Sequence, residues 1–246
     1  MDLHGQVVAV TGASSGIGEA VALQAAAAGA AVSLAARRTD RIEALAQRIE
    51  SEGGRALAIE TDMGEEDQAR AFVERTNAEL GRLDALVNNA GVMLLGPIEN
   101  APTEEWRRMV HVNVFGVLYG SHAAVPIMLE QGSGTIVNVS SVAGRVARAG
   151  SGVYNLTKFG VGAFSESLRQ EVTGRGIRVV VVEPGAVATE LADHLRDEVR
   201  QGMMKRFEGL KFLEADDIAR AVIYALVQPE HVSINEVLVR PTGQEG

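Results

Sequence analysis

Short runs of small and β-branched apolar residues alternate along the chain with longer segments in which apolar residues recur every three or four positions. The short runs are apolar on both faces, which is typical of parallel strands covered by helices on each side. They predict strands at residues 7–11, 31–36, 56–60, 85–88, 135–139, 177–182 and 236–239, and the clearest helices at 17–28, 40–52 and 65–80. The alternation indicates an α/β fold, a Rossmann-like doubly wound parallel sheet of about seven strands with helices on both faces.

No linker, charge run or long repeat interrupts this alternation, so we expect residues 1–246 to form a single domain. The segment 189–213 departs from the pattern, because its charges are dense and Met203, Phe207 and Leu210 recur at helical spacing. We expect a helical insertion at the edge of the sheet. Two interpretations are open: a mobile lid over a substrate, favoured by Gly202 and Gly209, or a permanent part of the core.

The composition narrows the class of function. Lys and Arg number 23 and Asp and Glu 32, and the formal net charge of −9 disfavours binding to nucleic acid or to an anionic membrane surface. The sequence has neither a run of about 18 apolar residues nor a signal-peptide layout, so we expect a cytoplasmic protein. Cysteine is absent and the five histidines lack metal-ligand spacing, so we expect neither a thiol nucleophile nor a catalytic metal.

The candidate chemistry begins after the first predicted strand, where glycines follow the spacing G-x-x-x-G-x-G before a helical run. Such glycines let the backbone turn tightly and approach a pyrophosphate, whose charge the helix N-terminus then meets. This order of strand, glycine loop and helix predicts a dinucleotide site. Its residues are Gly12, Ser14, Ser15, Gly16, Ile17 and Gly18.

The type of dinucleotide follows from the end of the second strand, where an NAD site would place an acidic residue on the ribose hydroxyls. The chain instead has Arg37 and Arg38 there. Two guanidinium groups suit a 2′-phosphate, so we expect NADP(H). Asp62, after the third strand, has two open interpretations: it accepts a hydrogen bond from an adenine amino group, or it caps the next helix.

Tyr154 and Lys158 are four residues apart, so they share one face of a predicted helix. An ammonium group beside the phenol would lower the pKa of Tyr154 and prepare it as a general acid and base. Ser141, after the fifth strand, would donate a hydrogen bond to a substrate carbonyl oxygen. Asn113 interrupts a helical run, and we expect a kinked helix that holds water. The residues expected around the substrate are Met93, Leu94, Ser141, Tyr154 and Phe207.

The chain contains, in this order, T-G-A-S-S-G-I-G, N-N-A-G, the helical Asn113, Ser141, Y-x-x-x-K and P-G. With these motifs it resembles the short-chain dehydrogenase/reductase family from Gly5 to about Gly243. The resemblance implies that Tyr154 is the general acid and base, that Lys158 also binds the nicotinamide ribose, and that Ser141 polarises the carbonyl. Asn113 would help to hold a water relay to Tyr154, and Arg37 best matches the family's 2′-phosphate contact. The further cofactor contacts that it implies are Ser14, Arg38, Asp62, Met63, Asn89, Ala90, Gly91, Pro184, Gly185, Val187 and Thr189.

Three stretches, 91–97, 158–171 and 235–242, are similar to the clavulanic acid dehydrogenase type of NADP-dependent reductase, which reduces an aldehyde. We therefore expect hydride transfer between NADP(H) and an aldehyde or ketone, or the corresponding alcohol, by a homotetramer or homodimer. One alternative is a 3-oxoacyl carrier-protein reductase, whose basic docking patch the acidic residues of 189–213 disfavour. Another is a non-catalytic NADP-sensing protein, which the retention of Ser141, Tyr154 and Lys158 disfavours.

Overall fold

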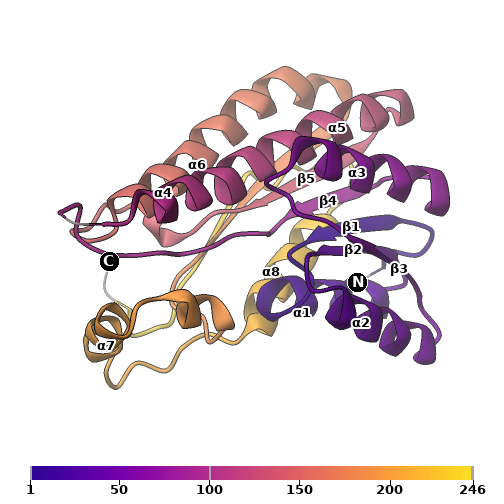
Figure 1. Cartoon of the computed structure of the whole chain (residues 1–246). Coiled ribbons are helices and arrows are strands. Elements are labelled where there is room, and N and C mark those ends of the chain that lie inside the picture. The colour runs from indigo at the N-terminus through magenta and orange to yellow at the C-terminus, as the bar shows by residue number, and fades with distance from the viewer. Residues whose placement is uncertain (1, 100, 245–246) are drawn as a thin grey trace.

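In the computed structural model, which describes residues 2–99 and 101–244, the strands pair in parallel in a seven-stranded sheet (Figure 1). Their order, β3-β2-β1-β4-β5-β6-β7, is the doubly wound arrangement predicted above. β6 continues two residues beyond its predicted end because Glu183 and Pro184 pair with the edge strand β7. The strands are β1 (Val7–Thr11), β2 (Ala31–Ala36), β3 (Arg55–Glu60), β4 (Ala85–Asn88), β5 (Gly134–Val139), β6 (Ile177–Pro184) and β7 (Glu236–Val239).

Two layers of helices sandwich the sheet (Figure 1). Side chains alternate across β1, so Val8 and Val10 pack with one layer and Ala9 with the other. The edge strands are less buried than predicted: Glu60 of β3 and Leu238 of β7 are exposed, because each edge strand has a neighbour on one side only. The first layer holds α1 (Gly16–Ala27), α2 (Thr39–Ser51) and α8 (Ala215–Leu226), and the second holds α3 (Glu66–Leu80), α5 (Gly116–Gln131) and α6 (Gly152–Val172).

The long helix that ends in α5 contains a wide turn at Asn113. Here α4 (Thr103–Val110) leads into a π-helical turn, η1 (His111–Phe115), and then into α5. The irregularity predicted at Asn113 is thus a π turn, a feature that often marks functional sites. By length and hydropathy alone, Thr103–Gln131 would qualify as a membrane span. Its inner face packs on the sheet, where Asn113 and Ser121 are buried and hydrogen-bonded, so it is a core helix of this fold.

Between β6 and α8 the chain forms short helical pieces. A 3₁₀ turn, η4 (Glu190–His194), precedes α7 (Asp197–Arg206), which projects to one side of the molecule (Figure 1). The segment returns to the sheet where Leu213 bridges Val187. The single helical stripe predicted through Phe207 and Leu210 is wrong, because α7 ends before Phe207 and the left-handed Gly209 (φ +77°) turns the chain away. Two further 3₁₀ turns are η2 (Val142–Gly144) and η3 (Thr173–Arg175).

Candidate functional site

A cavity of about 1390 Å³ runs along the carboxyl ends of the central strands. Doubly wound sheets bind ligands at this edge, where the strand order reverses between β1 and β4. The residues predicted to contact cofactor or substrate all line this cavity except Gly18, Leu94 and Asn113. Leu94 packs instead against the apolar cluster around Met109, and Leu95 lines the cavity in its place.

The glycine loop between β1 and α1 is packed too tightly for side chains. A Cβ at Gly12 would lie 2.9 Å from the Cα of Ala90, and one at Gly18 would lie 2.3 Å from the carbonyl oxygen of Gly12. Gly12 and Gly16 also have positive φ angles, of +65° and +57°. Ser15 makes no side-chain capping bond to α1, so the first N–H groups of this helix are available to an anion in the cavity. The loop therefore fits a pyrophosphate.

Thr11, at the end of β1, is a positioning residue that the sequence analysis missed. Its hydroxyl oxygen accepts hydrogen bonds from the N–H groups of Asn89 and Ala90, both at 3.0 Å. The side-chain amide of Asn89 donates back to the carbonyl oxygen of Thr11 at 3.0 Å. These bonds fix the loop after β4 against the glycine loop. The available signal was a hydroxyl directly before the glycines.

Arg37 and Asp62 both line the cavity and form a loose pair, with 3.8 Å between Nη1 of Arg37 and Oδ2 of Asp62. The helix-capping interpretation of Asp62 is wrong, because α3 begins after Glu65. Asp62 instead accepts a hydrogen bond from the N–H of Gly64 at 3.0 Å, which closes a tight turn. The adenine contact of Asp62 stays a prediction.

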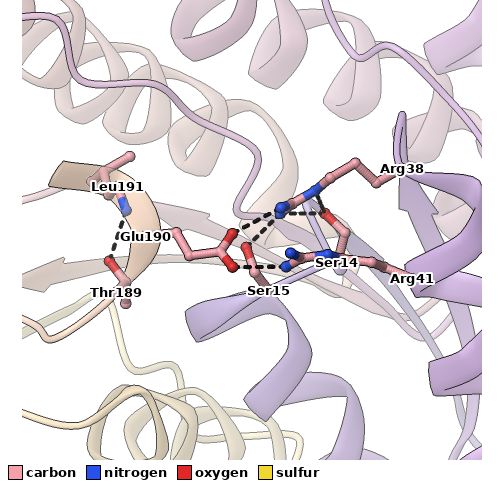
Figure 2. A network of polar contacts seen from close by, with 7 residues as sticks. All are labelled: Ser14, Ser15, Arg38, Arg41, Thr189, Glu190 and Leu191. Carbon is pink, nitrogen blue, oxygen red and sulfur yellow. Dashed lines mark hydrogen bonds and ion pairs between the residues drawn. The ribbon is translucent and has the colours of Figure 1, made fainter. Parts of the chain in front are cut away.

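Arg38 belongs to a polar network that joins the glycine loop and the start of α2 to Glu190 (Figure 2). It donates to the hydroxyl oxygens of Ser14 and Ser15 at 3.0 and 2.7 Å, and to the carboxylate of Glu190 at 2.8 Å. Arg41, one helical turn further along α2, donates to the other carboxylate oxygen at 2.7 Å. Hydrogen bonds from Arg41 and then Arg38 lower the pKa of Glu190 to about 2. Arg41 and Glu190 are partners of this site that no local sequence pattern indicated.

Tyr154 and Lys158 lie in α6 and are both only 7% exposed. Burial raises the pKa of Tyr154 to about 12, with a hydrogen bond to Ser141 acting the opposite way. Burial also lowers the pKa of Lys158 to about 8. The expected lowering of the Tyr154 pKa by Lys158 is therefore wrong for this structure. The Lys158 Nζ lies 5.8 Å from the phenol ring centroid, and the desolvation of the phenolate dominates the shift. Tyr154 is thus neutral at pH 7 and holds a proton to donate.

Ser141 stands at the turn between β5 and η2, with its hydroxyl on the cavity wall. It accepts a hydrogen bond from the N–H of Ala143 at 3.1 Å and donates a longer one, 3.4 Å, to the carbonyl of Pro184. Asn155 holds the following loop, since its amide donates to the carbonyls of Ala143 and Val146. Asn155, which the sequence analysis missed although it follows Tyr154 directly, therefore keeps Ser141 in place beside the tyrosine.

Asn113 does not line the cavity, but it holds the loop that does. Its side chain donates to the carbonyl of Val92 and accepts from the N–H of the same residue, both at 2.8 Å. It also donates to the hydroxyl of Thr157, in the turn of α6 next to Lys158. A Cβ at Gly91 would be 3.4 Å from the Asn113 amide oxygen. Asn113 is thus a positioning residue here, and the expected water relay stays a prediction.

Part of the cavity wall is apolar. Met93, Met203, Phe207 and Phe212 line it, and the two phenylalanine rings meet edge to face with centroids 5.7 Å apart. Within the described ranges, the structure places no group of three His, Cys, Asp or Glu side chains where they would hold a metal ion. The cavity therefore brings together a loop that fits an anion, the hydroxyl groups of Ser141 and Tyr154 with the buried Lys158, and several apolar side chains.

Comparisons with known proteins assign the chain to a family. The family model described as short chain dehydrogenase matches residues 6–200. An uncharacterized oxidoreductase of Staphylococcus saprophyticus is 42% identical over 243 residues, which cover 97% of each chain. The glycine betaine reductase of Emericella nidulans is 42% identical over 239 residues, which cover 97% of this chain but 19% of that longer protein.

Solved structures agree in fold over almost the whole chain. A closed form of serine dehydrogenase complexed with NADP⁺ superposes with a TM-score of 0.91 at 31% identity, covering 98% of this chain and 97% of that one. An alcohol dehydrogenase of the archaeon Thermococcus sibiricus, complexed with 5-hydroxy-NADP, has a TM-score of 0.88 at 28% identity and covers 98% of both chains. This chain belongs to the short-chain dehydrogenase/reductase family.

Proposed function

We propose that this oxidoreductase transfers a hydride between NADP(H) and an aldehyde or ketone, or the corresponding alcohol, with Tyr154 as general acid and base. The observation that carries the proposal is the convergence of Ser141, Tyr154 and Lys158 on a cavity whose other end holds Arg37 and Arg38. The NADP-type dinucleotides bound to similar solved structures support the same cofactor. When bound, NADPH supplies the hydride that adds to the carbonyl carbon.

The residues of the chain supply the proton and stabilise charge. In reduction, the Ser141 hydroxyl donates a hydrogen bond to the substrate oxygen as negative charge develops there. Tyr154, whose phenol is neutral at pH 7, passes its proton to the same oxygen. The nearby Lys158 cation stabilises the phenolate that remains. In oxidation the tyrosine takes the proton back.

The apolar part of the cavity wall supports a substrate with a hydrocarbon portion next to its carbonyl group. Met93 and Phe207 both line the cavity, so a chain or ring packed against them would be shielded from water. A likeness to the clavulanic acid dehydrogenase type stays a prediction, since the curated relatives above are an uncharacterized oxidoreductase and a glycine betaine reductase.

We also propose a homodimer or homotetramer in the cytoplasm. Leu156 and Phe159 on α6 are 63% and 44% exposed, and large apolar side chains that stand side by side on a surface favour contact with a partner. Light scattering after size exclusion would test the assembly, and a monomer at micromolar concentration would contradict it.

The reaction is tested with a panel of carbonyl compounds assayed by NADPH oxidation. The panel contains short and long aldehydes, cyclic ketones, an aldehyde of the clavulanate type and a 3-oxoacyl thioester, and matching alcohols are assayed with NADP⁺. Turnover of at least one aldehyde or ketone is expected. A protein that binds NADPH yet turns over no member in either direction would contradict the proposal and favour the sensing alternative. Preference for the thioester would favour the acyl carrier-protein alternative.

A further inference from the structure

Glu190 is the first residue after Thr189, at the start of η4, and its side chain extends from there so that its carboxylate lies between two arginines (Figure 2). Oε2 meets Arg38 and Oε1 meets Arg41, so both oxygens are engaged. The hydroxyl of Ser15 also contacts this carboxylate. Glu190 therefore joins the segment after β6 to the glycine loop and to the start of α2.

The groups around this carboxylate form a site for a larger anion. Two guanidinium groups and the hydroxyls of Ser14 and Ser15 converge beside the N-terminus of α1. This donor set suits a phosphate monoester, which offers three oxygens and a charge of about −1.5 to −2 where a carboxylate offers two oxygens and −1. The site lies at the end of β2, where the 2′-phosphate of the proposed cofactor would reach.

We propose that Glu190 is an internal anion that occupies the 2′-phosphate subsite and that NADP(H) displaces it on binding. The inference rests on the proposed NADP(H) dependence. Displacement releases the contact that ties η4 to Arg38 and Arg41, so the 2′-phosphate is sensed at the start of the segment that leads into α7. A dinucleotide without this phosphate leaves the contact in place.

The exposure of the network makes such an exchange feasible. The side chains of Arg38, Arg41 and Glu190 are 43%, 46% and 42% exposed, and ion pairs as open as these are held weakly. A dianion therefore replaces the carboxylate without breaking into the core. Because part of the population holds the subsite closed, the apparent dissociation constant of a 2′-phosphate is raised by the reciprocal of the open fraction.

The test compares Glu190→Gln with Asp193→Asn, a control that removes a carboxylate from the same turn without touching Arg38 or Arg41. Both variants change the net charge equally, so general electrostatic attraction of anions is matched. The probes are adenosine 2′,5′-bisphosphate and adenosine 5′-phosphate, titrated by calorimetry, with NADPH and NADH as a second pair. Glu190→Gln should bind the two 2′-phosphorylated probes about three- to tenfold more tightly and the other two within about twofold of wild type.

Several outcomes would overturn the inference. The first is that Glu190→Gln binds the bisphosphate no more tightly than wild type, and the second is that Asp193→Asn gains the same affinity. The third is that Glu190→Gln gains equal affinity for both adenosine phosphates, because Glu190 would then weaken the binding of any anion and not of the 2′-phosphate alone. If wild type prefers the bisphosphate and Glu190→Gln shows the same preference, this inference fails and the proposed cofactor preference stands. If neither protein prefers the bisphosphate, the proposed cofactor preference fails as well.

Discussion

The Nζ of Lys158 donates a hydrogen bond of 2.9 Å to the backbone carbonyl of Val139, the last residue of β5. This bond anchors the lysine of α6 to the sheet two residues before Ser141. The carbonyl replaces only part of the water that the ammonium loses, so burial lowers the pKa of Lys158 to about 8. A buried cation at the proposed site thus costs stability at neutral pH.

Replacing Lys158 by methionine should reveal that cost as a pH dependence. The folded pKa of about 8 lies below the ordinary value of 10.5, so the unfolded chain binds more protons and wild-type stability rises with pH through this window. Between pH 7 and 9, wild type should gain about 1 kcal/mol of unfolding free energy relative to Lys158→Met, as measured in urea. Turnover should fall in the same variant. The exposed Lys211→Met is the control, and a pH-independent difference for Lys158→Met would contradict the lowered pKa.

Tyr154→Phe keeps the buried ring and removes the proposed proton donor. Turnover should fall by about 10² to 10⁴, because general acid and base groups contribute that much, while NADPH binding stays within about twofold. Steady-state rates and fluorescence titration measure the two effects. Tyr224→Phe, at a ring that is 52% exposed on α8, should change neither. Near-normal turnover in Tyr154→Phe would place the proton donor elsewhere.

Gly18→Ala tests the packing of the glycine loop. The new Cβ would lie 2.3 Å from the Gly12 carbonyl oxygen and 2.6 Å from the Asn89 amide nitrogen, so the loop must shift. We expect a loss of about 1–3 kcal/mol of stability, together with weaker dinucleotide binding. Gly174→Ala, in the exposed turn η3 with no neighbouring atom within 4 Å, should be neutral or stabilising by up to about 1 kcal/mol. Similar melting temperatures for wild type and Gly18→Ala would contradict the close approach.

The strands and the glycine loop were predictable because their signals are local. A strand that is apolar on both faces, such as Val7–Thr11, can be recognised without knowing which distant residues it contacts. The same holds for the glycine spacing directly after it. The spacing of Tyr154 and Lys158 likewise follows from helix geometry alone. These predictions depend on periodicity, which the sequence carries directly.

The rest depends on contacts between residues far apart in the chain. Glu190 reaches Arg38 across 152 positions, and no pattern around either residue indicates this pair. Asn113 is hydrogen-bonded to Val92, 21 positions earlier. The helical pattern around Asn113 does not indicate this contact, so its positioning role could not be predicted. The raised pKa of Tyr154 comes from burial, which the spacing to Lys158 does not report.

The preference for NADPH over NADH should be about ten- to hundredfold in dissociation constant, the range of one charge-assisted contact. Arg37 meets Asp62 only at 3.8 Å and is 57% exposed, so its guanidinium is available to the phosphate. Arg37→Met should remove part of the preference by weakening NADPH while NADH stays within about twofold. Arg75→Met, which breaks a surface pair with Glu79 on α3, is the control. Equal dissociation constants of wild type for the two cofactors would contradict the expectation.

Phe207 follows the last residue of α7 and packs edge to face on Phe212, and both rings line the cavity. Truncation there should remove part of a substrate wall rather than part of a closed core. Phe207→Ala should therefore change KM across substrates while the unfolding free energy changes little. Ile49→Val, at a side chain that is 2% exposed, should do the reverse and cost about 0.5–1.5 kcal/mol with KM unchanged.

Whether the segment 189–213 moves is decided by hydrogen exchange. The interpretation as a lid predicts that residues 195–212 are better protected with NADPH and substrate than without them, because closure excludes water around the reacting carbon. The cavity-lining position of Met203 and Phe207 supports this, since a ligand in the cavity would add contacts to both side chains. The comparison uses residues 218–226 of α8 as an internal reference, since Ile218, Val222 and Ile223 are fully buried or 1% exposed and should exchange alike in both states. Equal and strong protection of 195–212 in the two states would instead make the segment a permanent part of the core.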